Sequence, residues 1–118
     1  MRDDKENIIV ELSFEIALLI IEFSEILDEK KKHIISRHIL RSGTSIGANV
    51  REAQNAESQA DFIHKMKDAA KQADEIAYCL LLSQYSKNYP DTSLLQEKLN
   101  LIMRILNKII ATTKQKGE

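Results

Sequence analysis

The chain has 118 residues, of which 43% are hydrophobic and 30% are charged, with three Gly and one Pro. This composition excludes a disordered chain and a turn-rich all-β protein, and it favours long uninterrupted helices. The length fits one core, so we expect a single domain over residues 1–118.

The formal net charge of −1 conceals a division along the chain. Residues 1–29 carry nine acidic and two basic side chains, whereas residues 30–118 carry nine acidic and fifteen basic ones. Such a division fits a polyanion-binding face, and it also fits an acidic helix that lies beside basic helices of the same or a neighbouring subunit. We favour the second interpretation.

Cysteine usage and the N-terminal sequence bear on the cellular compartment. Cys79 is the only cysteine, so one chain can form neither an internal disulfide nor a cysteine-cluster zinc site. The first residues, MRDDKEN, are acidic where a signal peptide is basic, and Glu11, Glu15 and Glu22 interrupt the apolar stretch that follows. We therefore expect a cytoplasmic protein with no targeting or membrane-spanning segment.

The first helix is predicted from Asp4 to Glu29, because apolar residues recur there at alternating spacings of three and four. The predicted core stripe is Ile9, Leu12, Ile16, Leu19, Phe23 and Ile26. A second apolar set follows the same rhythm one position along and comprises Val10, Phe14, Ala17 and Ile21, with Leu18 beside them. This apolar surface is wider than one bundle core needs, so we expect something else to cover part of it.

The second helix is predicted from His33 to Asn55 and is rich in small residues. Its core side comprises Ile35, Ile39, Ser42, Ile46, Val50 and Ala53. Gly43 and Gly47 lie one turn apart, and each costs about 1 kcal/mol relative to Ala inside a helix, which favours a close approach by a neighbouring backbone. The alternative is a break in the helix at residues 42–45.

The third helix is predicted from Gln59 to about Ser86, opened by a capping box of Ser58 and Asp61. Its core stripe is Phe62, Met66, Ala69, Ala73, Ile76 and Leu80, flanked by Ile63, Ala70, Ala77 and Leu81. The strongest turn signal in the chain is residues 88–91, Asn-Tyr-Pro-Asp.

A capping box of Ser93 and Gln96 is then predicted to open the fourth helix, which ends near Thr113 before a frayed tail. Its core stripe is Leu95, Leu99, Ile102, Leu106 and Ile109. Four long helices joined by short links favour antiparallel neighbours. The predicted fold is therefore all-α, an antiparallel up-down-up-down four-helix bundle.

No catalytic or metal-binding pattern is present in the sequence. The histidines His33, His38 and His64 lack the spacing of a zinc protease helix, and the Glu-x-x-His pairs of a di-iron bundle do not occur. The stretch from Gly43 to Gly47 lacks the lysine of a phosphate-binding loop. We therefore expect no metal, no cofactor, no small-molecule substrate and no enzymatic activity.

One polar flank of the second helix has two interpretations. Arg41, Ser45, Asn49 and Glu52 follow at spacings of four, four and three, which places them on one side of a helix. They form either a structural network with a neighbouring helix, through Lys71 or Glu75, or a ligand-binding pocket. We favour the structural interpretation, because buried polar groups require partners.

Basic residues at helical spacing are candidates for phosphate contacts. The candidate nucleic-acid-binding residues are Arg37, Arg41, Arg51, Lys67, Lys71, Arg104 and Lys108. Each is equally compatible with an ordinary solvated face. Tyr78, Tyr85 and Tyr89 are candidates for base stacking, but a position at the bundle rim or in a subunit contact explains them better.

The stretch LRSGTSIGANVREAQNAESQADFIHKMKDAAKQADE, from Leu40 to Glu75, closely resembles the four-helix-bundle family of 23S rRNA intervening-sequence proteins. The preceding EKKKHIISRHI and the first and last predicted helices are also similar, so the resemblance covers nearly the whole chain. The same superfamily includes the accessory variability protein of diversity-generating retroelements, which works beside a reverse transcriptase. Those retroelement proteins are strongly basic, whereas this chain has a pI of about 6.3.

The resemblance implies a second helix that continues through Gly43 and Gly47. It also implies a ring-shaped homo-oligomer, typically a pentamer, with helices packed between subunits. RNA or a ribonucleoprotein is the partner that it implies. Our leading hypothesis is a non-enzymatic homo-oligomeric bundle that acts as an RNA- or ribonucleoprotein-associated scaffold. The alternative is a protein-interaction module that recruits an enzyme or a helical partner without nucleic acid.

Overall fold

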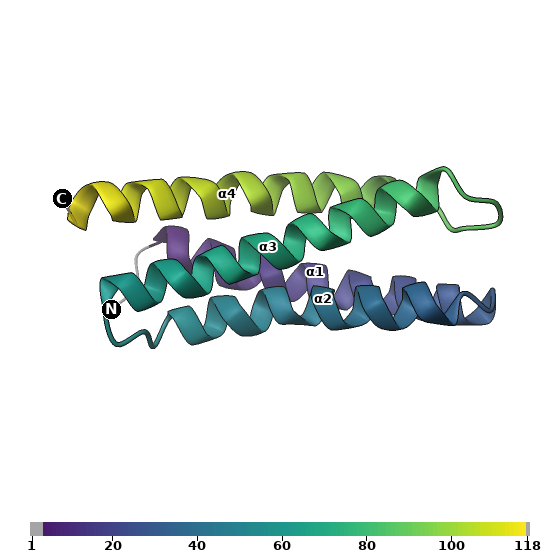
Figure 1. The fold of residues 1–118 in the computed structure, drawn as a ribbon, viewed down its shortest axis with the longest axis horizontal. Helices are drawn as coiled ribbons and strands as arrows, with labels where there is room; N and C mark the ends of the chain where they lie inside the picture. The colour runs from purple at the N-terminus through teal and green to yellow at the C-terminus, as the bar shows by residue number, and fades with distance from the viewer. Residues whose placement is uncertain (1–3, 118) are drawn as a thin grey trace.

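The computed structural model describes the backbone of residues 4–117 and the side chains of residues 8–116. It contains helices α1 (Asp4–Glu29), α2 (His33–Ala53), α3 (Gln59–Gln84) and α4 (Ser93–Gly117). Consecutive helices run in opposite directions along a rod of 49 × 21 × 20 Å (Figure 1). α2 packs against α1 and α3, and α4 packs against α3 and, less extensively, α1. The predicted antiparallel four-helix bundle is confirmed.

The helix boundaries agree with the sequence to within a few residues. Both ends of α1 lie where they were predicted, and α2 and α3 each end two residues earlier than expected. α4 continues to Gly117 instead of ending near Thr113, because no glycine or proline interrupts it earlier.

The predicted cap of α3 is confirmed and that of α4 is displaced by one residue. The Ser58 hydroxyl accepts a hydrogen bond from the Asp61 backbone N–H at 3.0 Å. At α4, Ser93 already belongs to the helix, and the Gln96 side-chain amide donates to the hydroxyl of Thr92 at 3.0 Å. The predicted box of Ser93 and Gln96 is therefore wrong, since Thr92 is the residue just before the helix.

The core face of α1 differs from the prediction at two positions. Ile20 and Leu27 are fully buried, whereas Leu19 is half-buried and Ile26 is 40% exposed. A strict alternation of three and four residues averages 3.5 per turn, and over several turns it drifts away from the 3.6-residue period of a straight helix. The buried face of α1 follows the longer period: Ile9, Leu12, Ile16, Ile20, Phe23 and Leu27.

Gly43 lets α1 and α2 approach closely. α2 is continuous through both of its glycines. A Cβ atom added at Gly43 would lie 2.6 Å from Cγ2 of Ile20, whereas one added at Gly47 would lie 3.7 Å from the backbone oxygen of Ser13. Beside these contacts, the Ser36 hydroxyl donates to the Ser24 carbonyl at 3.0 Å. The break considered at residues 42–45 does not occur, because glycine here serves helix packing.

Two turns meet at the end of the bundle opposite the start of α1 and the end of α4 (Figure 1). Lys31 and Asn88 each have a φ of 64°, in the left-handed region. Lys31 follows the end of α1, and Asn88 lies within the α3–α4 turn. Lys30 Nζ donates to Oδ1 of Asn88 at 3.3 Å, and Lys32 Nζ lies 5.0 Å from the centre of the Tyr89 ring. The lysine run thus links the α1–α2 turn to the α3–α4 turn.

Candidate functional site

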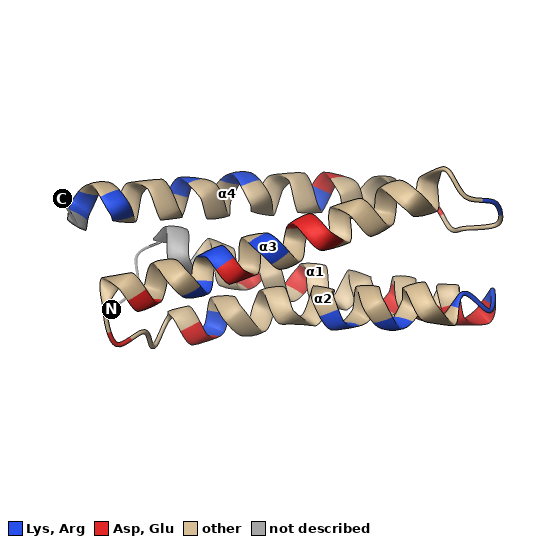
Figure 2. Cartoon of the chain, viewed as in Figure 1, with Lys and Arg blue, Asp and Glu red and all other residues tan. Residues whose placement is uncertain are grey.

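The seven candidate nucleic-acid-binding cations are all exposed on the outer surfaces of three helices. Arg37, Arg41 and Arg51 lie on α2, Lys67 and Lys71 on α3, and Arg104 and Lys108 on α4. Among the side chains of residues 8–116, none of the seven forms an ion pair. Figure 2 shows lysine and arginine positions at several levels along α2, α3 and α4.

One local group of like charges joins α3 to α4. The side chain of Lys67 meets that of Lys114. The neighbouring positive charge of Lys114, and to a lesser extent that of Lys71, lowers the pKa of Lys67 below its ordinary value. In an antiparallel pair, side chains that lean towards their own N-termini lean towards each other, which brings these lysines together. Helical spacing alone does not reveal Lys114 as a member of this group.

Two other lysines are neutralised within the bundle. Lys65 Nζ lies 3.2 Å from Oε1 of Glu52 and joins α3 to α2, and Lys98 Nζ lies 2.6 Å from Oε1 of Glu15 and joins α4 to α1. A hydrogen bond to the carboxylate raises the pKa of each lysine. The structure thus separates the lysines that pair with a carboxylate of another helix from the seven candidates, which have no such partner among residues 8–116.

The polar flank of α2 lies near the surface of the single chain. Arg41 and Glu52 are exposed, and Ser45 and Asn49 are half-buried. The Ser45 hydroxyl donates to the Arg41 carbonyl of its own helix at 2.8 Å, and Glu52 pairs with Lys65. The expected partner Glu75 instead accepts a hydrogen bond from the neighbouring Ser42 at 3.2 Å. Whether the flank has a structural or a ligand-binding role stays a prediction.

The tyrosines and the cysteine occupy different environments. Tyr78 on α3 and Tyr85 just after its end are 62% and 81% exposed, whereas Tyr89 is half-buried in the turn beside Lys32. Cys79 is buried and free, as expected of a small core residue. Burial, and the nearby charge of Glu75, raise the pKa of its thiol, which makes it a poor nucleophile.

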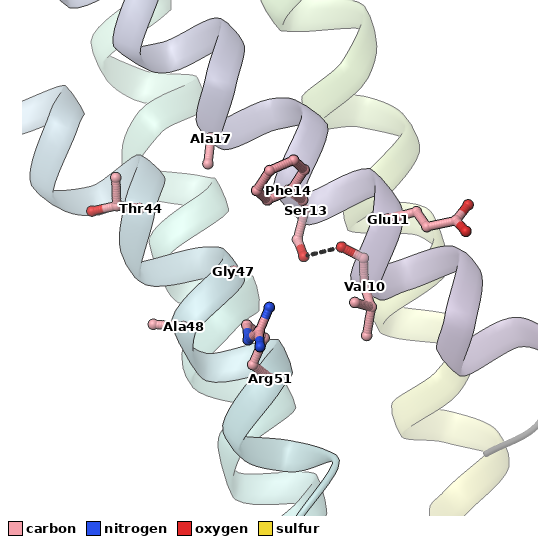
Figure 3. A pocket seen from close by; sticks show the side chains of 9 residues that line it. All are labelled: Val10, Glu11, Ser13, Phe14, Ala17, Thr44, Gly47, Ala48 and Arg51. Carbon is pink, nitrogen blue, oxygen red and sulfur yellow. Dashed lines mark hydrogen bonds between the residues drawn. The ribbon is translucent and has the colours of Figure 1, made fainter.

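A groove of about 550 Å³ runs along the outside of the bundle between α1 and α2 (Figure 3). Its lining residues are Val10, Glu11, Ser13, Phe14, Ala17, Thr44, Gly47, Ala48 and Arg51. α1 supplies the large side chain of Phe14, and the middle of α2 supplies only small residues. In Figure 3 the carboxylate of Glu11 points away from α2.

Three members of the second apolar set of α1 are exposed in the single chain, whereas Val10 and Ala17 are half-buried. The exposed fraction is 61% for Phe14, 49% for Leu18 and 39% for Ile21. Exposed apolar surface of this extent along one helix is typical of a face that packs against another molecule. The prediction that α1 carries more apolar surface than one core needs is therefore confirmed.

Clusters of potential metal ligands and membrane-spanning helices are both absent from the part of the chain that the structure describes. No group of three or more potential metal ligands from His, Cys, Asp or Glu occurs among the described residues. None of their helices combines the length and the hydropathy needed to cross a bilayer.

These features define a small antiparallel helical bundle with a glycine-mediated contact between its first two helices, an exposed apolar face and free surface cations. The sequence model of the 23S rRNA-intervening sequence protein family matches residues 5–110. The chain therefore belongs to this family, and the resemblance noted in the sequence is confirmed.

A solved structure shows the same fold at substantial sequence identity. It is the crystal structure of a protein with unknown function from the S23 ribosomal protein family of Bacteroides thetaiotaomicron. The two chains are 37% identical, and the match covers 91% of this chain and 98% of the other with a TM-score of 0.85. No curated protein sequence matches the chain.

Proposed function

We propose that the chain is a non-enzymatic, homo-oligomeric scaffold of the cytoplasm that associates with structured RNA. The exposed stripe of Phe14, Leu18 and Ile21 supports assembly, because water disfavours such a surface on a lone bundle. Membership of the family supports RNA as the partner. By resemblance to that family, the assembly is a pentameric ring.

The observation that carries the RNA interaction is the set of free cations. Lys67, Lys71, Arg104 and Lys108 are exposed on α3 and α4 without an ion pair among residues 8–116. A ring repeats these charges once per subunit, so weak phosphate contacts add up along one RNA molecule. The net charge of −1 does not oppose this, since binding depends on local charge.

RNA binding is tested with a labelled hairpin RNA titrated at several salt concentrations. We expect affinity to fall steeply with salt, and the double variants Lys67→Gln/Lys71→Gln and Arg104→Gln/Lys108→Gln to bind more weakly. Each should also reduce the slope of log K against log salt by about 0.7–0.9 for every phosphate that is no longer neutralised. Lys67 and Lys71 are both exposed, so their replacement should leave the bundle folded.

The matched control is Lys31→Gln/Lys87→Gln, which removes two exposed charges from the turns at one end of the bundle. It should leave the affinity within about twofold of the parent. Absence of binding even at low salt would refute the RNA proposal.

The alternative, recruitment of a protein partner without nucleic acid, is favoured by the exposed Tyr78 and Leu82 on α3 and Tyr85 just after its end. Tyrosine is enriched in protein interfaces and among the residues that contribute most to their binding energy. A single stoichiometric protein that stays bound after nuclease treatment, in a chain that binds no RNA, would support this alternative.

A further inference from the structure

The outward-facing sides of α1 and α2 carry complementary stripes. Each stripe has five residues whose positions alternate by three and four, the spacing of a coiled-coil contact. The outer stripe of α1 is Glu11, Phe14, Leu18, Ile21 and Glu25. The outer stripe of α2 is Arg37, Arg41, Thr44, Ala48 and Arg51. All ten side chains are exposed in the single chain, so the bundle's own core uses neither stripe.

The charges on the two stripes are opposite and free. Every charged residue of α1 from residue 8 to its end is acidic, and the only acid of α2, Glu52, is already paired with Lys65. Glu11 and Glu25 of α1, and the three arginines of the α2 stripe, form no ion pair among residues 8–116. The arginines on the α2 stripe of a second copy would thus provide charges opposite in sign to those of the two glutamates on the α1 stripe.

The two stripes also match residue by residue. When they are laid antiparallel, Glu11 faces Arg51 and Glu25 faces Arg37 at the two ends. Between these ends, the large Phe14 and Leu18 face the small Ala48 and Thr44, and Ile21 faces the aliphatic stem of Arg41. Large residues opposite small ones, with opposite charges at both ends, suit a close helix–helix contact.

This register agrees with the arrangement inside one chain. The contact between Gly43 and Ile20 shows which levels of the antiparallel α1 and α2 coincide along the bundle. The five facing pairs lie at these same levels, so two copies that make the contact stand side by side, pointing the same way. Copies at equal height are the arrangement that rotation about one axis produces.

We infer that α1 of one copy packs antiparallel against α2 of a second copy through these two outer stripes. α1 and α2 are neighbours in the bundle, so each contact turns the next copy by the same angle about one axis, and such a series closes into a ring. The inference rests on the homo-oligomer proposed above and names the surfaces that form it. It also assigns Arg37, Arg41 and Arg51 to the subunit contact and leaves the cations of α3 and α4 for RNA.

The first test compares Phe14→Ala with Tyr85→Ala by light scattering of the full chain. Both residues are exposed aromatics in the single chain, at 61% and 81%, so neither change should unfold the bundle, which circular dichroism checks. Phe14→Ala should reduce the assembly to a species near 13.5 kDa, and Tyr85→Ala should leave the assembly intact.

Charge reversal then tests the register. Glu11→Arg alone and Arg51→Glu alone should each dissociate the assembly, because each places like charges opposite one another. The double variant Glu11→Arg/Arg51→Glu should restore it. Dissociation without this restoration would contradict the facing pair.

A disulfide between two differently substituted chains tests whether the contact forms between copies and not within one chain. One chain carries Leu18→Cys and another carries Thr44→Cys, each with Cys79→Ala, and the two are mixed under mild oxidation. A disulfide-linked heterodimer should form, whereas Leu18→Cys mixed with Tyr78→Cys should give none.

The outcomes separate this inference from the proposed oligomer. A parent chain that is monodisperse near 13.5 kDa refutes the oligomer itself. A parent assembly that survives Phe14→Ala and both charge reversals, or that yields no Leu18–Thr44 cross-link, keeps the oligomer and overturns this interface.

Discussion

The two halves of the bundle are built differently. α1 and α2 meet through glycine and serine, with Gly43 against Ile20 and the Ser36 hydroxyl bonded to the Ser24 carbonyl. α3 and α4 are hydrogen-bonded near their ends by longer side chains, from Gln96 to Gln84 at 3.1 Å and from Gln59 to the Thr113 carbonyl at 2.7 Å. Their charges differ too, since the acidic α1 lies beside the mostly basic α2, whereas α3 mixes both signs and α4 is mostly basic. The buried contact between α1 and α2 therefore tolerates little change in side-chain size. The exposed sides of these two helices carry opposite charges.

The largest expected effect tests which face of α1 belongs to the core. Leu27→Ala removes a fully buried side chain and should lower the free energy of unfolding by about 2–5 kcal/mol. Ile26→Ala, at the adjacent 40% exposed position, should cost less than about 1 kcal/mol. Urea denaturation at one fixed chain concentration measures both, because assembly also contributes to stability. Equal losses would mean that the core stripe of α1 has been wrongly assigned.

The next effect tests the tight contact between α1 and α2. In Gly43→Ala the added methyl group lies within 3.0 Å of three side-chain atoms of the buried Ile20, and overpacking should outweigh the gain in helix propensity. We expect a net loss of about 1–2 kcal/mol. Gly47→Ala meets only ordinary contacts, from 3.7 Å, and should instead gain about 0.5–1 kcal/mol.

The free energies of unfolding of Gly43→Ala and Gly47→Ala are measured by thermal and urea unfolding. Shortening the opposing side chain in the double variant Gly43→Ala/Ile20→Ala should make the Gly43 substitution less harmful than it is alone. A stabilising Gly43→Ala would show that the helices separate easily and that the contact is not tight.

The smallest effect concerns the ion pair that links the two halves between α1 and α4. Glu15 raises the pKa of Lys98, so Glu15→Gln should return that pKa towards 10.5, as followed by NMR of the lysine side chain. Because the folded pKa is the higher one, the contribution of the pair to stability is present below the unfolded pKa and is lost as pH rises through the folded pKa. The stability of the parent and Glu15→Gln should therefore converge in strongly alkaline solution. An unchanged Lys98 pKa in the variant would exclude the pair in solution.

The sequence predicted most of the fold because long helices with few breakers leave few alternatives. It placed Ile9, Ile16 and Phe23 correctly but missed Ile20 and Leu27, since α1 is apolar on several sides and periodicity alone cannot choose among them. The Thr92 cap was missed because Thr92 and Ser93 are both good capping residues. Gly43 was understood as a close packing position, although which helix approached it required the structure.

The candidate site was less accessible to sequence reasoning. Helical spacing identified the free cations, but only the structure separates them from Lys65 and Lys98, whose partners lie on other helices. The approach of Lys114 to Lys67 depends on how α4 lies against α3. The outer stripe of α2 escaped notice because Arg37, Arg41, Thr44, Ala48 and Arg51 are not large hydrophobic residues, and a search for apolar periodicity passes over them.

The link between the two turns, from Lys30 to Asn88 and from Lys32 to Tyr89, makes the two ends of the bundle different. That end carries the paired turns, and the opposite end carries the start of α1 and the end of α4 (Figure 1). Copies standing side by side at equal height would display the α1–α2 and α3–α4 turns on one rim of the ring, and the α2–α3 turn with the ends of α1 and α4 on the other. A polypeptide fused after α4 would then appear once per subunit on a single side, and a partner would meet two chemically different faces.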